Sequence, residues 1–221
     1  NLNDSMMEKL ADKGNGNYAY IDSNEEARKA LGQQVAGTLY TIAKDVKIQV
    51  EFNPAKVAGY RLLGYENRLL ANRDFNDDKK DAGEIGAGHS VTALYEIVPA
   101  GQKVENDGIE LKYSEVKPSE TNFSDELLTV KLRYKEPKED TSKLLTIGLL
   151  DKNNSIENAS DNLKFASSVA QFGLLMRDSR FKGNSSFGNL TNLANSSLGN
   201  DLKGYRGDFI KLAEKAKRLK G

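Results

Sequence analysis

Strict alternation of apolar and polar side chains over residues 46–52 is the feature that most constrains the fold of this chain. Apolar residues at 46, 48, 50 and 52 alternate with Lys47, Gln49 and Glu51. Successive side chains of a strand point to opposite faces of a sheet, so the pattern predicts a strand with one buried face and one wet face. Asn53-Pro54 ends it. The chain therefore needs a sheet for this strand to join.

Further strands are predicted at residues 57–65, 90–98, 127–134 and 143–150. The segment 90–98 carries apolar side chains on both faces, which is typical of a central strand. Residues 101–126 are loop-like, with at most a short strand at 109–113. Several short strands separated by turn residues predict an antiparallel, sandwich-like arrangement.

Helices are expected on either side of these strands. Asp4 is a candidate N-cap for a short helix that ends at Gly14, and a strand is expected at residues 17–22. Ser23 and Glu26 have the spacing of a capping box for a helix reaching Lys44. After residue 151 the sequence predicts a helix capped by Ser160 and further helices at residues 190–198 and 205–219.

These elements predict an α+β protein. We expect a terminal helix-strand-helix at residues 1–44, a β-sandwich-like domain at 45–151, and a helical segment at 152–221 that packs on the sheet. Residues 152–221 are basic and the rest is acidic, although the whole chain has 32 basic and 32 acidic residues. The opposite charges favour packing of the two regions on each other.

The composition excludes several kinds of chemistry. The chain has no Cys and one His, so it forms no disulfide, thiolate-zinc site, iron–sulfur cluster or multi-histidine metal site. Zero net charge argues against nucleic acid as a partner. The longest apolar run, residues 144–150, is far shorter than the roughly 20 residues of a membrane helix, so we expect no direct membrane insertion. Because the chain begins at Asn1 without an initiator Met, we expect a piece of a longer protein.

Six segments carry a resemblance to a known family: residues 7–22, 37–39, 43–54, 60–68, 74–89 and 91–96. They resemble bacterial YfbK-like proteins that contain a von Willebrand factor type A domain. The resemblance extends from about Met7 to Leu219 and is most specific between Tyr18 and Pro99.

The resemblance implies that residues 1–44 are the end of an A domain whose larger part lies upstream. It also implies an upstream metal-ion-dependent adhesion site, which needs an Asp-x-Ser-x-Ser loop and suits Mg²⁺. This chain has no such loop; Asp22-Ser23-Asn24 lacks the spacing. We therefore expect no cofactor here. A cell-envelope location, periplasmic or surface-exposed, is what the resemblance implies.

One acidic loop is a weak candidate for calcium. Asp74, Asn76 and Asp78 fit positions one, three and five of a calcium-binding loop. Lys79 stands where the loop needs Gly, and Ile85 where it needs Glu. A solvated or salt-bridged loop is the favoured interpretation, and no metal site is expected.

Other polar residues are weak candidates for binding rather than catalysis. His89 could act as a general base with Asp81 or Glu84, but a structural role is favoured because no nucleophile motif lies nearby. Arg61 belongs to a charged group that could recognise a partner or form a network with the acidic loop at residues 77–84. The candidate binding residues are Arg61, Tyr65, Glu66, Asn67, Arg68, Asp81 and His89.

The favoured function is a non-enzymatic interaction or scaffolding module, coupled to its A domain through the helix at residues 23–44. Its expected partners are the upstream A domain and an unknown protein. One alternative is a hydrolase that uses Glu66, Asp81 and His89. The other is a ligand- or glycan-binding sandwich that presents Tyr60, Tyr65 and Tyr95.

Overall fold

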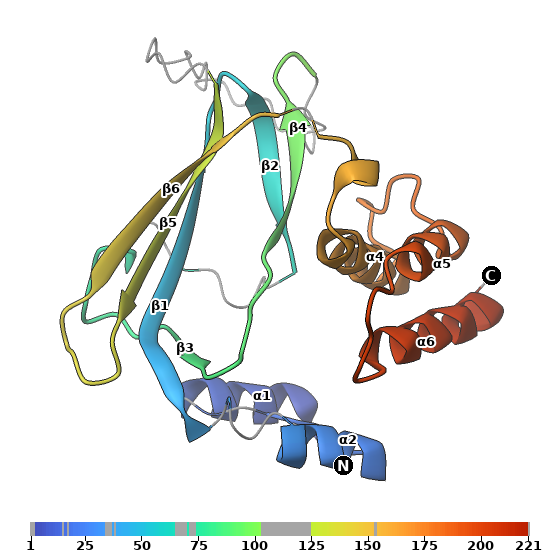
Figure 1. Ribbon diagram of the computed structural model, residues 1–221, viewed down its shortest axis with the longest axis horizontal. Coiled ribbons are helices and arrows are strands. Elements are labelled where there is room, and N and C mark those ends of the chain that lie inside the picture. The colour runs from blue at the N-terminus through green and yellow to red at the C-terminus, as the bar shows by residue number, and fades with distance from the viewer. Residues whose placement is uncertain are drawn as a thin grey trace. The chain divides into compact units, whose positions relative to one another are not determined.

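The computed structural model shows an α+β protein, as the sequence predicts. It describes residues 3–14, 16, 18–33, 37, 39–64, 70, 74–102, 125–152 and 154–220. Within them, Figure 1 shows helices at the two ends of the sequence and strands between them. The helices are α1 (Asp4–Lys13), α2 (Asn24–Arg28), η1 (Lys29–Gln33), η4 (Ile156–Asn158), α4 (Asp161–Met176), α5 (Phe187–Ser196) and α6 (Tyr205–Lys220). The strands are β1 (Thr41–Phe52), β2 (Val57–Leu63), β3 (Gly83–Gly86), β4 (Leu94–Pro99), β5 (Glu126–Lys135) and β6 (Lys143–Leu150).

The N-terminal segment differs from the prediction at the cap of α1 and at the strand expected for residues 17–22, and agrees with it at the cap of α2. Asn3, rather than Asp4, caps α1, because its side-chain oxygen accepts a hydrogen bond from the Met6 N–H at 3.2 Å. Residues 18–22 form no strand, since no strand in the described part of the chain lies beside them to pair with. Ser23 caps α2 as predicted, with the Glu26 N–H at 3.1 Å from its hydroxyl.

The predicted helix to Lys44 ends too late. It passes from α2 into the π-turn η1, and Gly37 and Leu39 are again helical. Residues 41–44, however, belong to β1, because Thr41 pairs with Gly86 and Ala43 with Ile85 of β3. Backbone pairing with a neighbouring strand therefore outweighs the helical spacing of the sequence here.

A four-stranded antiparallel sheet has the order β3-β1-β5-β6. β1 is central and pairs with β5 from Lys44 to Phe52. β5 and β6 form a hairpin in which Val130 lies opposite Ile147. The strands predicted at residues 46–52, 127–134 and 143–150 are thus confirmed.

β2 and β4 form a second, two-stranded antiparallel sheet. The strand predicted from residue 90 begins only at Leu94, and in the described residues it pairs with β2 alone. Within the part of the chain that the structure describes, β4 is therefore not the central strand that the sequence predicts. α4 also lies against β4.

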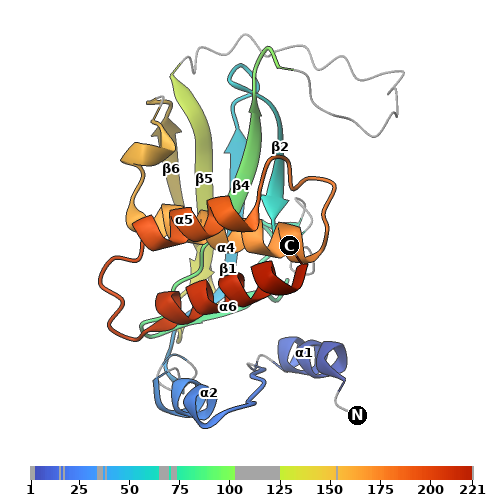
Figure 2. The ribbon, with the colours of Figure 1, turned by 90° about the vertical axis from the view of Figure 1, so that its right-hand side faces the viewer.

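The three C-terminal helices pack side by side, as Figure 2 shows. Ser160 caps α4 as predicted, and its hydroxyl accepts from the Leu163 N–H at 3.3 Å. Phe172 contacts Phe187 of α5 and Phe209 of α6 edge-to-face, with ring centroids 6.3 and 5.5 Å apart. Leu190 and Ala213 are completely buried. These contacts form an apolar core from one face of each amphipathic helix.

Contacts group the chain into two compact units. The first comprises residues 1–56, 68–91 and 117–150, and contains the four-stranded sheet. The second comprises residues 57–67, 92–116 and 151–221, and contains β2, β4 and the C-terminal helices. Residues 45–151 are thus shared between the two units, and the predicted boundaries after residues 44 and 151 stay predictions.

Candidate functional site

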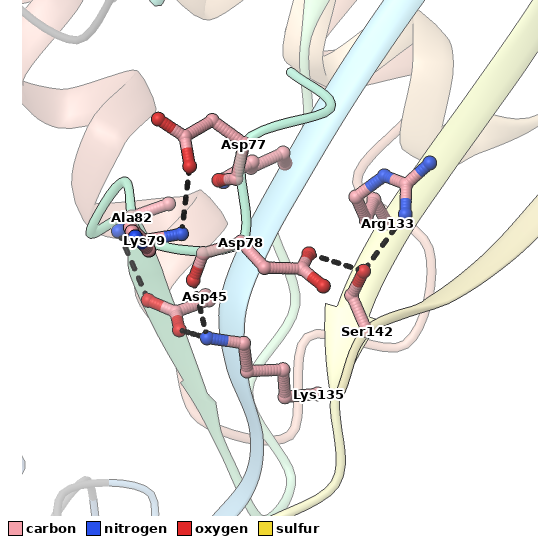
Figure 3. Close-up of polar contacts among 9 residues, drawn as sticks. Asp45, Asp77, Asp78, Lys79, Ala82, Arg133, Lys135 and Ser142 are labelled. Atoms are coloured by element: carbon pink, nitrogen blue, oxygen red, sulfur yellow. Dashed lines mark hydrogen bonds and ion pairs between the residues drawn. The ribbon is translucent and has the colours of Figure 1, made fainter. Parts of the chain in front are cut away.

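A cluster of buried and half-buried polar side chains lies where the loop at residues 74–82 crosses β1 and β5 (Figure 3). Lys135, near the end of β5, is 9% exposed and donates to Asp45 Oδ2 at 2.6 Å and to the Asp78 carbonyl at 2.7 Å. Lys47 of β1 is 3% exposed and donates to the Asp77 carbonyl. A buried ammonium is costly unless its hydrogen bonds are satisfied, and the loop backbone supplies the acceptors. We call Asp45, Lys47, Asp78, Arg133, Lys135 and Ser142 the polar clamp.

Asp45 occupies an unusual backbone position in this clamp. Its φ is +49°, in the left-handed region, and it lies at an irregularity in the pairing of β1 with both neighbouring strands. Its carboxylate accepts from the Ala82 N–H at 3.2 Å as well as from Lys135. Aspartate tolerates this backbone region better than most residues, and its two bonds hold the bulge in place.

The charges of the clamp stabilise one another. Partial burial acts to raise the pKa of Asp45, but the hydrogen bonds from Lys135 and Ala82 outweigh it and the net pKa lies below the ordinary value. The hydrogen bond to Asp45 is the main cause that raises the pKa of Lys135. Both groups are therefore held in their charged forms near neutral pH.

A second branch of the clamp joins the loop to the β5–β6 turn. The Ser142 hydroxyl donates to Asp78 Oδ1 at 2.5 Å and accepts from Arg133 Nη1 at 2.8 Å. The hydrogen bond from the Ser142 hydroxyl is the main cause that lowers the pKa of Asp78. Arg133 Nη2 also donates to Asn76 Oδ1 at 3.0 Å, and its guanidinium lies 5.6 Å from the centre of the buried Phe75 ring.

The proposed calcium ligands thus make contacts with the protein's own cations and hydroxyl. Asn76 accepts from Arg133, Asp78 from Ser142, and Asp74 lies 3.8 Å from Lys80. In the described residues, no group of three His, Cys, Asp or Glu gathers where it could hold a metal ion. The geometry favours the salt-bridged loop, which was the preferred interpretation of the sequence.

The sequence interpretation missed the buried lysines. It placed Lys47 on a wet face, yet Lys47 is buried under the loop while Ile48, on the predicted buried face, is 48% exposed. A signal was present in the acidic composition of residues 74–81, which calls for nearby cations. No local pattern identifies Lys47 and Lys135 as those cations, because they come from two different strands.

His89 and Asp81 lie in the same unit as the clamp and are exposed. The backbone N–H of His89 closes a turn onto the Gly86 carbonyl at 3.0 Å. Glu84 accepts from the Thr41 hydroxyl at 3.1 Å. Tyr65, Glu66, Asn67 and Arg68 lie outside the described residues, so the arrangement of a Glu66–Asp81–His89 group stays a prediction.

Arg61 has a different environment from the one expected. It pairs with Glu96, its cross-strand neighbour on β4, rather than with the acidic loop. Its guanidinium also stacks on Phe181, 3.9 Å from the ring centre, and Nη2 donates to the Phe181 carbonyl at 3.1 Å. Arg61 therefore ties the loop after α4 to the β2–β4 ribbon.

Tyr60 and Tyr95 also lie on this ribbon. Their rings are 6.4 Å apart and inclined by 60°, and Tyr60 is exposed. Burial is the main cause that raises the pKa of Tyr95. The two rings do not form the coplanar platform that stacking on a sugar requires, and Tyr65 lies outside the described residues.

The N-terminal segment carries an unburied apolar surface. No side chain described between Asn3 and Ile42 is buried. Nine large apolar residues in it are 41–69% exposed: Met6, Met7, Leu10, Tyr20, Ile21, Leu31, Leu39, Tyr40 and Ile42. We call these nine residues the N-terminal apolar surface. An exposed apolar group of this extent is typical of an interaction site.

Fold and site together define an α+β protein with an ion-paired sheet and an open apolar N-terminal segment. The chain belongs to the family described as "Uncharacterized protein YfbK, C-terminal", whose model matches residues 37–219. It is 41% identical over 217 residues to the "Uncharacterized protein YfbK" of Escherichia coli strain K12. The match covers 98% of this chain and 37% of that relative, so the chain spans little more than a third of the relative's length. No solved structure matches the chain.

Proposed function

We propose that this chain is a non-enzymatic interaction module whose N-terminal apolar surface docks on an A domain that precedes it in the longer protein. The observation that carries the proposal is that all nine side chains of that surface are at least 41% exposed. Burying apolar area contributes roughly 25 cal/mol per Å² to stability. This many exposed apolar side chains in one segment therefore indicate that another domain covers them in the longer protein.

The comparisons support a boundary inside the chain. The family match begins at residue 37, whereas the match to the E. coli relative extends over nearly the whole chain. Residues before 37 are thus shared with the longer relative but precede the C-terminal family region. This is the arrangement expected if residues 3–33 complete the preceding domain.

The connection to β1 gives this docking a route into the sheet. β1 begins at Thr41, and the Thr41 hydroxyl donates a hydrogen bond to Glu84 of β3. Four residues later, Asp45 is fixed by Lys135 and by the Ala82 N–H. A displacement of the N-terminal segment would therefore act on β1 close to the polar clamp. We propose that the clamp either holds β1 in place or transmits the displacement to the loop at residues 74–82.

The side chains of the clamp support a structural rather than a catalytic role. Asp45 and Asp78 are held ionised by Lys135 and Ser142, whereas a general base at neutral pH needs a pKa near the working pH. His89 and Asp81 are exposed.

None of the helices in the described ranges is long and apolar enough to cross a membrane. A cell-envelope location and a further protein partner remain part of the proposal.

Hydrogen exchange in the full-length protein tests the docking. We expect amides of residues 4–13 and 24–33 to be protected, and Leu10→Asp to abolish the protection because a charge would be buried against the A domain. Leu212→Asp is the matched control, since Leu212 is 52% exposed on α6 and Leu10 is 55% exposed on α1. Rapid exchange of both segments in the unaltered protein would refute docking.

Removal of Mg²⁺ tests the coupling separately. If the segment senses the adhesion site that the resemblance implies upstream, exchange at residues 24–33 and 41–46 changes when EDTA replaces Mg²⁺. Exchange in α4 should stay constant, because its apolar core is remote in sequence from this connection. Unchanged exchange at residues 24–33, with docking intact, rejects the coupling and leaves the docking.

A further inference from the structure

The edge strand β6 is exposed along its whole length. All eight residues from Lys143 to Leu150 are exposed, and the leucines and Ile147 are 48–67% exposed. In the described residues, β6 pairs only with β5, so its other edge has no partner strand among them. Between Lys143 and Asp151 it contains no charge and no proline. Natural sheets normally protect a long, apolar edge strand of this kind with a charge, a proline, a bulge or a covering segment.

The opposite edge of the same sheet is protected. β3 has four residues, of which two are glycines and one is the charged Glu84. The contrast indicates that β6 is kept free of protection for pairing with another strand.

One face of the sheet is apolar up to this edge. The register places Ile48, Val50 and Phe52 of β1 beside Leu132, Val130 and Leu128 of β5, and these beside Leu145, Ile147 and Leu149 of β6. None of these nine side chains is buried. A strand added at β6 would extend this three-by-three lattice by a fourth column.

We propose that the strand added at β6 is β6 of a second copy of this chain, antiparallel to the first and related by a two-fold axis at Ile147. This register places Lys143 of each copy opposite Asp151 of the other, and Leu144 and Leu145 opposite Leu150 and Leu149. The charges at the two ends are thereby complementary, and the apolar residues between them face one another. A two-fold axis satisfies both ends at once, as an isologous contact requires.

The contact is small, since it joins two eight-residue strands. We therefore expect a weak dimer with a dissociation constant on the order of 1–100 μM. Lys143 already pairs with Glu136 and Glu139 in the β5–β6 turn, which holds its ammonium at the end of the edge.

Sedimentation equilibrium of the full-length protein tests the dimer. Ile147→Lys places like charges opposite each other at the axis and should weaken association about ten-fold or more. Leu202→Lys is the control, because Leu202 is 87% exposed and lies outside the strands. A monomer at 100 μM, or equal association of the unaltered protein and Ile147→Lys, overturns the proposal.

Disulfide crosslinking tests the register; this chain itself has no cysteine, and the unaltered full-length protein is the control for any cysteine outside it. Ile147→Cys should form a disulfide-linked dimer, because opposed residues of antiparallel strands have Cα atoms about 4.5–5.5 Å apart, within disulfide range. Leu144→Cys should not crosslink alone but should crosslink when mixed with Leu150→Cys. The proposal is overturned if Leu144→Cys alone crosslinks as well as Ile147→Cys alone. It is also overturned if the amides of β6 are protected from hydrogen exchange in a monomer.

Discussion

The C-terminal helices and the four-stranded sheet bury opposite kinds of side chain. Six of the eight buried apolar residues in the described chain lie on α4, α5 and α6: Leu174, Leu190, Ala194, Ile210, Ala213 and Ala216. The buried side chains described on the strands of the four-stranded sheet are Lys47 and Lys135. One region is thus held by apolar packing, and the other depends on hydrogen-bonded charges.

The difference has consequences for stability and for motion. Apolar packing is non-directional and nearly independent of pH, whereas a buried ion pair depends on geometry and on the protonation of both partners. The helices should therefore behave as a stable body. The sheet should respond to pH and to changes at Asp45, which lies four residues after the point where the N-terminal segment enters the sheet at Thr41.

The largest expected effect is in the helical core. Leu190 has no exposed surface and lies three residues after Phe187 on α5, the helix that contacts Phe172 of α4. Leu190→Ala removes buried apolar atoms and leaves a cavity, so we expect a loss of about 2–5 kcal/mol in the free energy of unfolding. Urea denaturation followed by far-ultraviolet circular dichroism measures it.

Leu212→Ala is the matched control for that substitution. Leu212 lies on α6 but is 52% exposed, so its truncation should cost no more than about 0.5 kcal/mol. Equal losses for the two variants would mean that the helices do not share a packed core, and the comparison with the sheet would fail.

A smaller and pH-dependent effect is expected in the clamp. Asp45→Asn keeps an oxygen that can accept from Ala82 and tolerates the positive φ, but it removes the charge that faces Lys135. The variant should be less stable than the unaltered protein at pH 7, by less than Leu190→Ala. Because the pKa of Asp45 is lowered in the folded state, this difference is present above the unfolded pKa of about 3.9 and disappears as pH falls through the folded pKa.

Urea midpoints of both proteins between pH 3 and pH 7 measure this dependence. Leu190→Ala serves as the contrast, since its loss should vary little with pH. A difference for Asp45→Asn that is as large at pH 3 as at pH 7 would show that the carboxylate contributes through shape rather than charge.

The sequence predicted elements well where local pattern and tertiary environment agree. The strands at β1 and β5 and the Ser160 cap of α4 follow from local features, and the structure confirms them, although the predicted buried and wet faces of β1 are wrong at Lys47 and Ile48. The strand expected at residues 17–22 is absent at residues 18–22, because strand formers need a neighbour that no local pattern supplies. Likewise, helical spacing near Thr41 was outweighed by pairing with β3.

The candidate site was harder to predict because its partners are distant in sequence. Asp45 and Lys135 are 90 residues apart, and Asp78 and Ser142 are 64 apart. The acidic loop could be recognised as a place that needs cations, but which lysines supply them depends on the register of β1 and β5. The same holds for Arg61, whose partner Glu96 is defined only by the pairing of β2 with β4.

The smallest expected effect tests whether charge also matters in the second unit, which contains β2, β4 and the C-terminal helices. Arg61 combines an ion pair with Glu96 and a stack on Phe181. Arg61→Lys keeps the charge but loses the planar stack, so we expect a loss of about 0.5–1 kcal/mol in the free energy of unfolding. Glu96→Gln removes the ion pair alone, and because Glu96 is about half exposed its effect should be smaller still. If Glu96→Gln lowers the free energy of unfolding more than Arg61→Lys does, the second unit also depends on paired charge. The contrast with the four-stranded sheet is then one of degree.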